Sequence, residues 1–229
     1  MYRLYIANKN YSSWSLRPWV LMQQLGIEFE EILVPFGQSA DPAGFRAFSP
    51  TGKVPCLVDN GTTIWDSLAI IEYLAETHAA VWPADKVARA WARCASAEMH
   101  SGFTQIRNIC GMNCGLRVKL YHPKAELLTE WQRIDQLWCE GLEQFGGPLL
   151  AGDTFTAVDA FYAPLAFRAQ TYTPALSEQA NQYVQRLLAL SSMQQWYDAA
   201  LKESWRDEEH ELEAKAVGEW LADLRISAE

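Results

Sequence analysis

The chain has 229 residues, enough for one large domain or two small ones. Because 49% of them are hydrophobic, either arrangement can form a packed core. The net charge is −9, from 19 basic and 28 acidic side chains, and no basic cluster is present, which argues against binding to nucleic acid or to an anionic membrane surface. No apolar run is long enough to span a bilayer, and the N-terminus lacks a secretory signal pattern, so we expect a soluble, cytoplasmic protein.

The five cysteines are an odd number without the spacing of a disulfide framework, so we expect reduced thiols. Cys110 and Cys114 are four residues apart in a predicted helix and could form a metal or redox pair. No histidine or second cysteine pair supports such a site, so we interpret them as buried core thiols and expect no metal.

The first predicted elements are a strand over residues 2–6 and a helix that ends at Gly26. Pro18 fits only the first turn of a helix, which places Ser12 and Ser13 in the preceding loop or at the cap. The unpaired amides and the positive end of the helix dipole favour an anion there, and a hydroxyl can donate one more hydrogen bond to it. The alternative is that these serines only cap the helix.

Alternating apolar and acidic residues over 27–34 predict a second, half-buried strand. Residues 35–52 are rich in Gly, Pro, Ser and Asp, which indicates a loop with one short helix over 42–48. Asn60-Gly61 then separates two β-rich runs, and this dipeptide is a strong signal for a hairpin.

Asp66 or Ser67 caps the next predicted helix, whose apolar residues recur at helical spacing over 68–74. The order strand, helix, strand, hairpin, helix predicts one mixed sheet with helices packed on it. This unit closes near residue 78, and 79–86 form a linker.

From residue 87 onward the pattern is helical and no β-rich alternation persists. Helices are predicted over residues 87–109, 124–145, 157–171, 177–190 and 193–204. Thr156 and Asp159 have the spacing of a capping box, which favours a structural role for this pair. Residues 205–229 are charged and predict a loosely docked surface helix.

Four motifs follow one another along the chain: Ser12-Ser13-Trp14-Ser15 with Arg17, then Val54-Pro55 before the hairpin, then Asp66-Ser67, then the helical second half. In this order they resemble a cytosolic glutathione S-transferase. The serine cluster is most similar to the zeta and theta-like classes. The resemblance covers nearly the whole chain. It implies a thioredoxin-like α/β domain over 1–78, a linker over 79–86, and an all-α domain over 87–229 that contributes the pocket for the electrophile.

The resemblance also implies roles for the predicted site residues. Val54, before a cis proline, would pair its backbone with the cysteinyl part of glutathione, as an added strand pairs with a sheet edge. Ser67 would bind the γ-glutamyl carboxylate and Asp66 its ammonium group, and Lys53 would meet the glycyl carboxylate. Each of these residues could instead be an ordinary strand or cap residue.

A free thiol has a pKa of roughly 8.5, so a hydroxyl, free amides and a helix N-terminus would each favour its thiolate form. Ser12 is the first candidate for the hydroxyl and Ser13 the second. Arg17 could add positive potential, although an arginine in a first helical turn is more often a surface or salt-bridge residue. The thiolate would attack an electrophilic carbon of a small, largely apolar substrate, as in detoxification.

Candidates for the pocket of that second substrate lie on the first helix of the second half: Met99, Phe103, Arg107 and Met112. Apolar residues at helical spacing more often belong to a core. Three other functions remain open: isomerisation of the maleylacetoacetate type, a non-catalytic binding or regulatory role, and a thiol-dependent oxidoreductase. The isomerase arginine of the zeta class lacks a clear counterpart, since Arg168 lies about three positions early, and the oxidoreductase would need a cysteine where Trp14 stands. The resemblance implies a homodimer.

Overall fold

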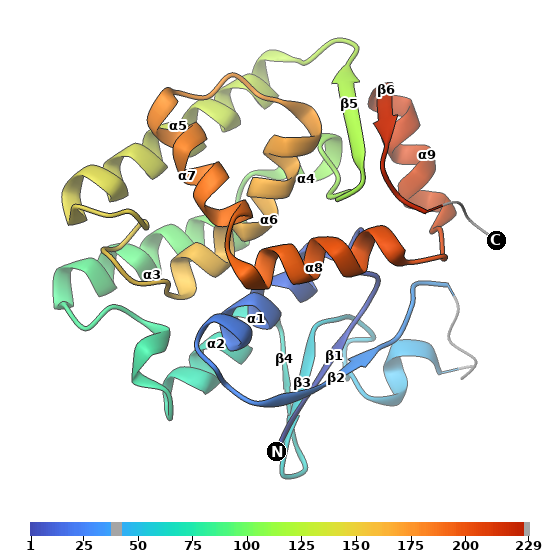
Figure 1. Ribbon diagram of the computed structural model, residues 1–229. Coiled ribbons are helices and arrows are strands. Elements are labelled where there is room, and N and C mark those ends of the chain that lie inside the picture. Colours follow the sequence, from blue (N-terminus) through green and yellow to red (C-terminus); the bar gives the residue numbers. More distant parts are fainter. Residues whose placement is uncertain (38–42, 227–229) are drawn as a thin grey trace.

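The computed structural model describes residues 1–37 and 43–226, and its N-terminal domain is built on a four-stranded sheet (Figure 1). The strands are β1 (Tyr2–Ile6), β2 (Phe29–Leu33), β3 (Cys56–Asp59) and β4 (Thr62–Trp65). Their order is β2-β1-β3-β4, in which β1 pairs in parallel with β2 and antiparallel with β3, and β3 pairs antiparallel with β4. The predicted mixed sheet is therefore confirmed.

The β3–β4 hairpin and the segment before it adopt the backbone that their residues favour. Asn60 and Gly61 have φ angles of 46° and 87°, the positive values that a tight hairpin turn requires. The Val54–Pro55 peptide is cis, as the family resemblance implies. The short helix predicted over 42–48 is one 3₁₀ turn, η1 (Gly44–Ala47), and Pro42 lies outside the described residues.

Two helices belong to the N-terminal domain, and the others follow a second 3₁₀ turn, η2 (Ala79–Val81). The helices are α1 (Ser13–Gln24), α2 (Ser67–Ala75), α3 (Lys86–Ser101), α4 (Thr104–Ile109), α5 (Ala125–Phe145), α6 (Ala157–Tyr172), α7 (Glu178–Leu188), α8 (Ser191–Lys202) and α9 (Glu208–Val217). This thioredoxin-like α/β domain followed by a helical domain is the fold that the sequence predicts.

The single helix predicted over 87–109 is wrong, because the chain breaks between α3 and α4. Phe103 has a left-handed backbone, with φ of 57°, which no helix interior accommodates. The guanidinium of Arg107 then donates to the carbonyl oxygens of Met99, His100 and Gly102, at the end of α3. Arg107 thus satisfies carbonyls that a helix terminus leaves unpaired.

The end of the chain also differs from the predicted surface helix. After α9, strand β6 (Gly218–Asp223) pairs antiparallel with β5 (Leu116–Leu120), a two-stranded sheet within the helical domain. The Arg225 side chain, 1% exposed, bridges Asp223 at 2.7 Å and Glu211 of α9 at 2.5 Å. These contacts dock the tail firmly against the domain.

Helix α6 is the centre of the helical domain, and it packs directly on α1 of the first domain (Figure 1). The predicted capping box at its start is confirmed. The buried Asp159 carboxylate accepts from the amides of Leu150 at 3.1 Å and Thr156 at 3.0 Å, and from the Tyr183 hydroxyl at 2.9 Å. Burial nevertheless raises the pKa of Asp159 to about 6. Among the described residues, none of the helices has the length and apolar character of a membrane span.

Candidate active site

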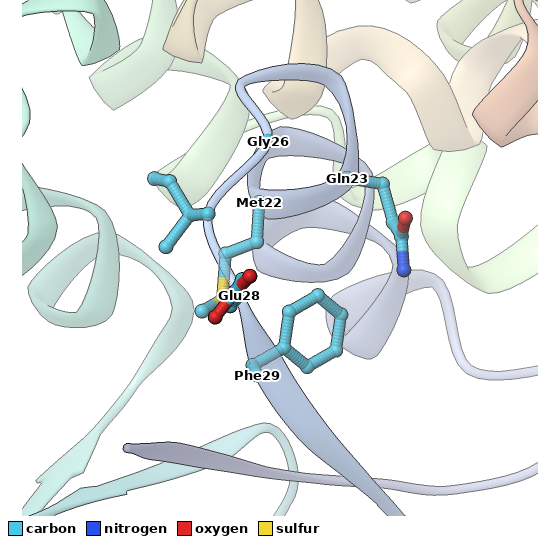
Figure 2. Close-up of a pocket in the computed structure, with 6 residues that line it drawn as sticks. Met22, Gln23, Gly26, Glu28 and Phe29 are labelled. Atoms are coloured by element: carbon cyan, nitrogen blue, oxygen red, sulfur yellow. The ribbon is translucent and has the colours of Figure 1, made fainter.

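A cavity of about 420 Å³ lies where the segment before β3 meets the start of α2. It is lined by Trp14, Thr51, Lys53, Val54, Pro55, Trp65, Asp66 and Ser67. The structure therefore brings together the four residues that the family resemblance assigns to glutathione, from two stretches of the N-terminal domain. A second hollow, at the other end of α1, contains none of the predicted site residues (Figure 2).

The start of α2 presents one satisfied and one free polar side chain to this cavity. The Asp66 carboxylate caps the helix by accepting from the Leu68 amide at 2.8 Å. Ser67 is 1% exposed, and its hydroxyl has no hydrogen-bond partner among the residues that the structure describes. A free hydroxyl at a helix N-terminus, beside unpaired amides, is well suited to bind a carboxylate.

His100, at the end of α3, reaches the same helix start from the second domain. Its Nε2 lies 3.6 Å from Oδ2 of Asp66, and its ring meets that of Trp14 edge-on. Burial lowers the pKa of His100, and the charge of Asp66 opposes that shift. Asp66 is therefore placed between the cavity and the helical domain. The sequence analysis did not single out His100, because its link to Asp66 spans 34 residues and leaves no local signal.

The two candidate serines are more enclosed than the loop position predicted for them. Ser12 is the N-cap residue of α1 and Ser13 its first residue, and the two residues are 5% and 9% exposed. The Ser12 hydroxyl donates to Oγ of Ser15 at 2.7 Å. Oγ of Ser13 accepts from Nη2 of Arg168 at 3.3 Å. Neither serine lines the cavity; the adjacent Trp14 does.

Arg17 lies on the buried side of α1 and not at the surface or in a salt bridge. It is 1% exposed, and within residues 1–37 and 43–226 its Nε and Nη1 have no hydrogen-bond partner. Its guanidinium lies 4.1 Å from the ring centroid of Trp14, and that of Arg107 lies 4.6 Å from the same centroid. Burial, and then the charges of Arg107 and Arg168, lower the pKa of Arg17. Arg17 therefore lies within electrostatic range of two other arginines and of one opposing carboxylate, that of Asp66.

The residues predicted for the second-substrate pocket do not gather around this cavity. Met99, Phe103 and Met112 are 1%, 7% and 2% exposed and belong to the hydrophobic core. Arg107 caps α3 and contacts Trp14. Their burial favours the packing role that the sequence analysis gave as the alternative. Over residues 1–37 and 43–226 there is no group of three His, Cys, Asp or Glu side chains arranged to hold a metal ion.

Residues 11–77 match the family model for the N-terminal domain of glutathione S-transferases. The chain is 31% identical to a probable maleylacetoacetate isomerase of Caenorhabditis elegans, over 76% of this chain and 81% of that protein. It is 26% identical to the maleylacetoacetate isomerase of Rattus norvegicus, over the same shares. A glutathione transferase homologue from Burkholderia, solved with bound glutathione, is 26% identical with a TM-score of 0.63, over 87% of this chain and 97% of that one.

These likenesses, together with the fold, define the class: the chain belongs to the glutathione S-transferase family, an enzyme family that includes transferases and isomerases. The cavity beside Val54 and Ser67 lies in the domain that the family model matches.

Proposed function

We propose that the protein is a glutathione transferase that binds glutathione in the cavity between Trp14 and the start of α2. The observation that supports this most strongly is the meeting of Lys53, Val54, Asp66 and Ser67 around one cavity of about 420 Å³. Glutathione, a tripeptide with two free carboxylates, an ammonium group and a thiol, matches that combination of side chains.

In the proposed complex, the backbone of Val54 pairs with the cysteinyl residue of glutathione, as a strand added to a sheet edge does. The Ser67 hydroxyl and the N-terminus of α2 bind the γ-glutamyl carboxylate, and Asp66 binds its ammonium group. The exposed Lys53 meets the glycyl carboxylate.

The thiol then lies toward the N-terminus of α1, where a serine hydroxyl and the helix dipole favour its anion. The thiol proton leaves to solvent, and the serine keeps its own proton and donates it in a hydrogen bond to sulfur. The thiolate attacks an electrophilic carbon of a largely apolar substrate, a C–S bond forms, and the leaving group departs with its bonding pair. We further propose that the enzyme works as a homodimer in the cytoplasm.

The test is the conjugation of glutathione to a chlorinated nitrobenzene, with calorimetry of glutathione binding alongside. We expect saturable conjugation by the wild type and a large loss of kcat in Ser12→Ala or Ser13→Ala. An active wild type matched by both variants would contradict the serine mechanism. No binding at millimolar glutathione would favour a non-catalytic, regulatory role.

A second candidate is a glutathione-dependent cis–trans isomerase of a carboxylate-bearing substrate. Two observations favour it: relatives named maleylacetoacetate isomerase, and the guanidinium groups of Arg17 and Arg107 beside Trp14. In this reaction the thiolate adds to the double bond, the resulting single bond rotates, and sulfur is expelled again, so glutathione is regenerated. Isomerisation of maleylacetoacetate without consumption of glutathione would identify this activity.

A further inference from the structure

A buried arginine of α6 contacts the first residue of α1. Arg168 is 5% exposed, and its Nη1 donates to the carbonyl oxygens of Ile106, at 3.3 Å, and Cys110. Its Nη2 donates to Oγ of Ser13 at 3.3 Å. In the part of the chain that the structure describes, it forms no ion pair with a carboxylate. Its charge is thus met only by carbonyl dipoles and one serine hydroxyl.

Arg168 stays charged in spite of this burial. Its pKa is lowered from the ordinary value to about 10: burial is the largest cause, Cys110 and Tyr172 oppose the shift, and Arg107 adds to it. A group with that pKa is almost fully protonated at neutral pH. The hydrogen bond to Ser13 is therefore charge-assisted, and such bonds are about twice as strong as neutral ones.

The two candidate serines differ in what their hydroxyl protons can do. The Ser12 proton is engaged by Ser15, whose oxygen also accepts from the Ala7 amide at 3.3 Å. Ser13 accepts from Arg168, and among the hydrogen bonds of the described residues its hydroxyl donates none. A hydroxyl has one proton and two lone pairs, so the contact with Arg168 leaves the Ser13 proton free for a ligand.

We propose that Arg168 is a positioning residue for glutathione activation: its guanidinium orients and polarises the Ser13 hydroxyl, which makes Ser13 the principal donor to the glutathione sulfur. This inference rests on the proposed function and deepens it. A hydrogen bond received from a cation strengthens the one that the same hydroxyl donates, because bonds in series polarise one another. The helical domain thus takes part in activating a thiol that the other domain binds.

The test measures the pKa of the thiol of bound glutathione, from the ultraviolet absorbance of its thiolate as the pH is varied. The proteins compared are the wild type, Arg168→Met, Arg168→Lys and Ser13→Ala. We expect Arg168→Met to raise the pKa of the bound thiol by about one unit, with a change in Kd below about threefold. At a pH below both pKa values this is about a tenfold loss of thiolate. Arg168→Lys keeps the charge and should restore part of the shift.

Thr171→Val is the matched control, since Thr171 is a buried residue of the same helix whose hydroxyl donates to the Asn113 carbonyl at 2.7 Å. It removes a buried hydrogen bond without touching Ser13, and we expect no change in the thiol pKa. A shift as large as that of Arg168→Met would show a general effect of loosening α6 and would overturn the proposal.

The double variant decides whether Arg168 acts through Ser13. In the Ser13→Ala background, Arg168→Met should cause no further shift of the thiol pKa. An equal shift in both backgrounds would contradict the proposal. A larger effect of Ser12→Ala than of Ser13→Ala on the thiol pKa would also contradict it. A wild type that binds no glutathione, or leaves its thiol unshifted, contradicts the proposed function itself. A lowered thiol pKa that survives Arg168→Met contradicts only the role of Arg168.

Discussion

The helices α1 and α2 both begin with a serine after a polar N-cap residue, but their N-terminal ends are stabilised in different ways. At α2, Asp66 caps its own helix and Ser67 leaves its hydroxyl free beside the cavity. At α1, Ser12 bonds within its own segment, whereas Ser13 is contacted by an arginine of the other domain. The first end is built by local sequence, and the second depends on residues more than 150 positions away.

The loop before α1 shows the same dependence on the helical domain. The Glu203 carboxylate, which follows α8, accepts from the amides of Lys9 at 2.6 Å and Asn10 at 3.3 Å. Nε1 of Trp196 donates to the Lys9 carbonyl at 2.8 Å. Changes in the helical domain should therefore affect the α1 end more than the α2 end, which caps itself through Asp66 and meets the helical domain at His100.

The largest effect is expected from Glu203→Ala, because it leaves two buried amides without an acceptor. Each such loss costs about 1–3 kcal/mol, so we expect the free energy of unfolding to fall by about 4 kcal/mol. Glu203→Gln keeps one acceptor oxygen and should lose about half as much. Urea unfolding followed by tryptophan fluorescence measures both, and a loss below about 1 kcal/mol would show that the loop does not need this carboxylate.

Helix α6 carries Arg168 near its C-terminal end, and the stabilisation of its N-terminal end should weaken as the pH rises. The pKa of Asp159 is raised by burial from 3.8 to about 6. Its stabilising contribution is therefore fully present below the unfolded pKa and is lost as the pH rises through about 6. The wild type should lose about 2.5 kcal/mol relative to the non-titrating Asp159→Asn between pH 4 and pH 7. Parallel stability curves for the two proteins would contradict a raised pKa.

Ser67→Ala tests the N-terminal end of α2, the end that is built from residues close in the sequence. It removes the free hydroxyl at the cavity, and hydrogen bonds to charged groups are worth about 1.5–3 kcal/mol, so Kd for glutathione should rise about tenfold or more. The free energy of unfolding should hardly change. Ser96→Ala is the matched control, because Ser96 is also buried with an unpartnered hydroxyl but does not line the cavity. Calorimetry should find unchanged affinity for this control.

The smallest expected effect distinguishes the capping role of Asp66 at α2 from its proposed role in binding glutathione. Asp66→Ala and Asp85→Ala each remove an N-cap, that of α2 and that of α3, and each should cost about 1 kcal/mol of stability. Only Asp66→Ala should also weaken glutathione binding, because Asp85 is not at the cavity. Equal affinities for the two variants would mean that Asp66 serves as a cap alone.

The sequence predicted the elements whose signals are local. Asn60-Gly61 predicted the hairpin, and Thr156 with Asp159 predicted the capping box. The sequence did not predict the pairing of β5 with β6, because these strands lie about 100 residues apart. It also did not predict the left-handed backbone of Phe103, which has no signature in its residue type. Pairing of this kind is decided by tertiary packing and not by propensity.

The candidate site divides in the same way. Lys53, Val54, Asp66 and Ser67 were found through motifs that lie close in the sequence, and they line one cavity. Three features of the site depend on residues of different elements: the burial of Arg17, the contact of His100 with Asp66, and the contact of Arg168 with Ser13. Such contacts appear only once α1, α3 and α6 are packed together.

The central claim is that glutathione lies with its sulfur at the start of α1 and its peptide against Val54. A crystal structure of the protein with glutathione tests it most directly. It should show the sulfur within hydrogen-bonding reach of Oγ of Ser13, the cysteinyl backbone paired with Val54 and the γ-glutamyl carboxylate on Ser67. Glutathione bound elsewhere, or a sulfur that contacts neither serine while the peptide fills the cavity, would contradict this claim.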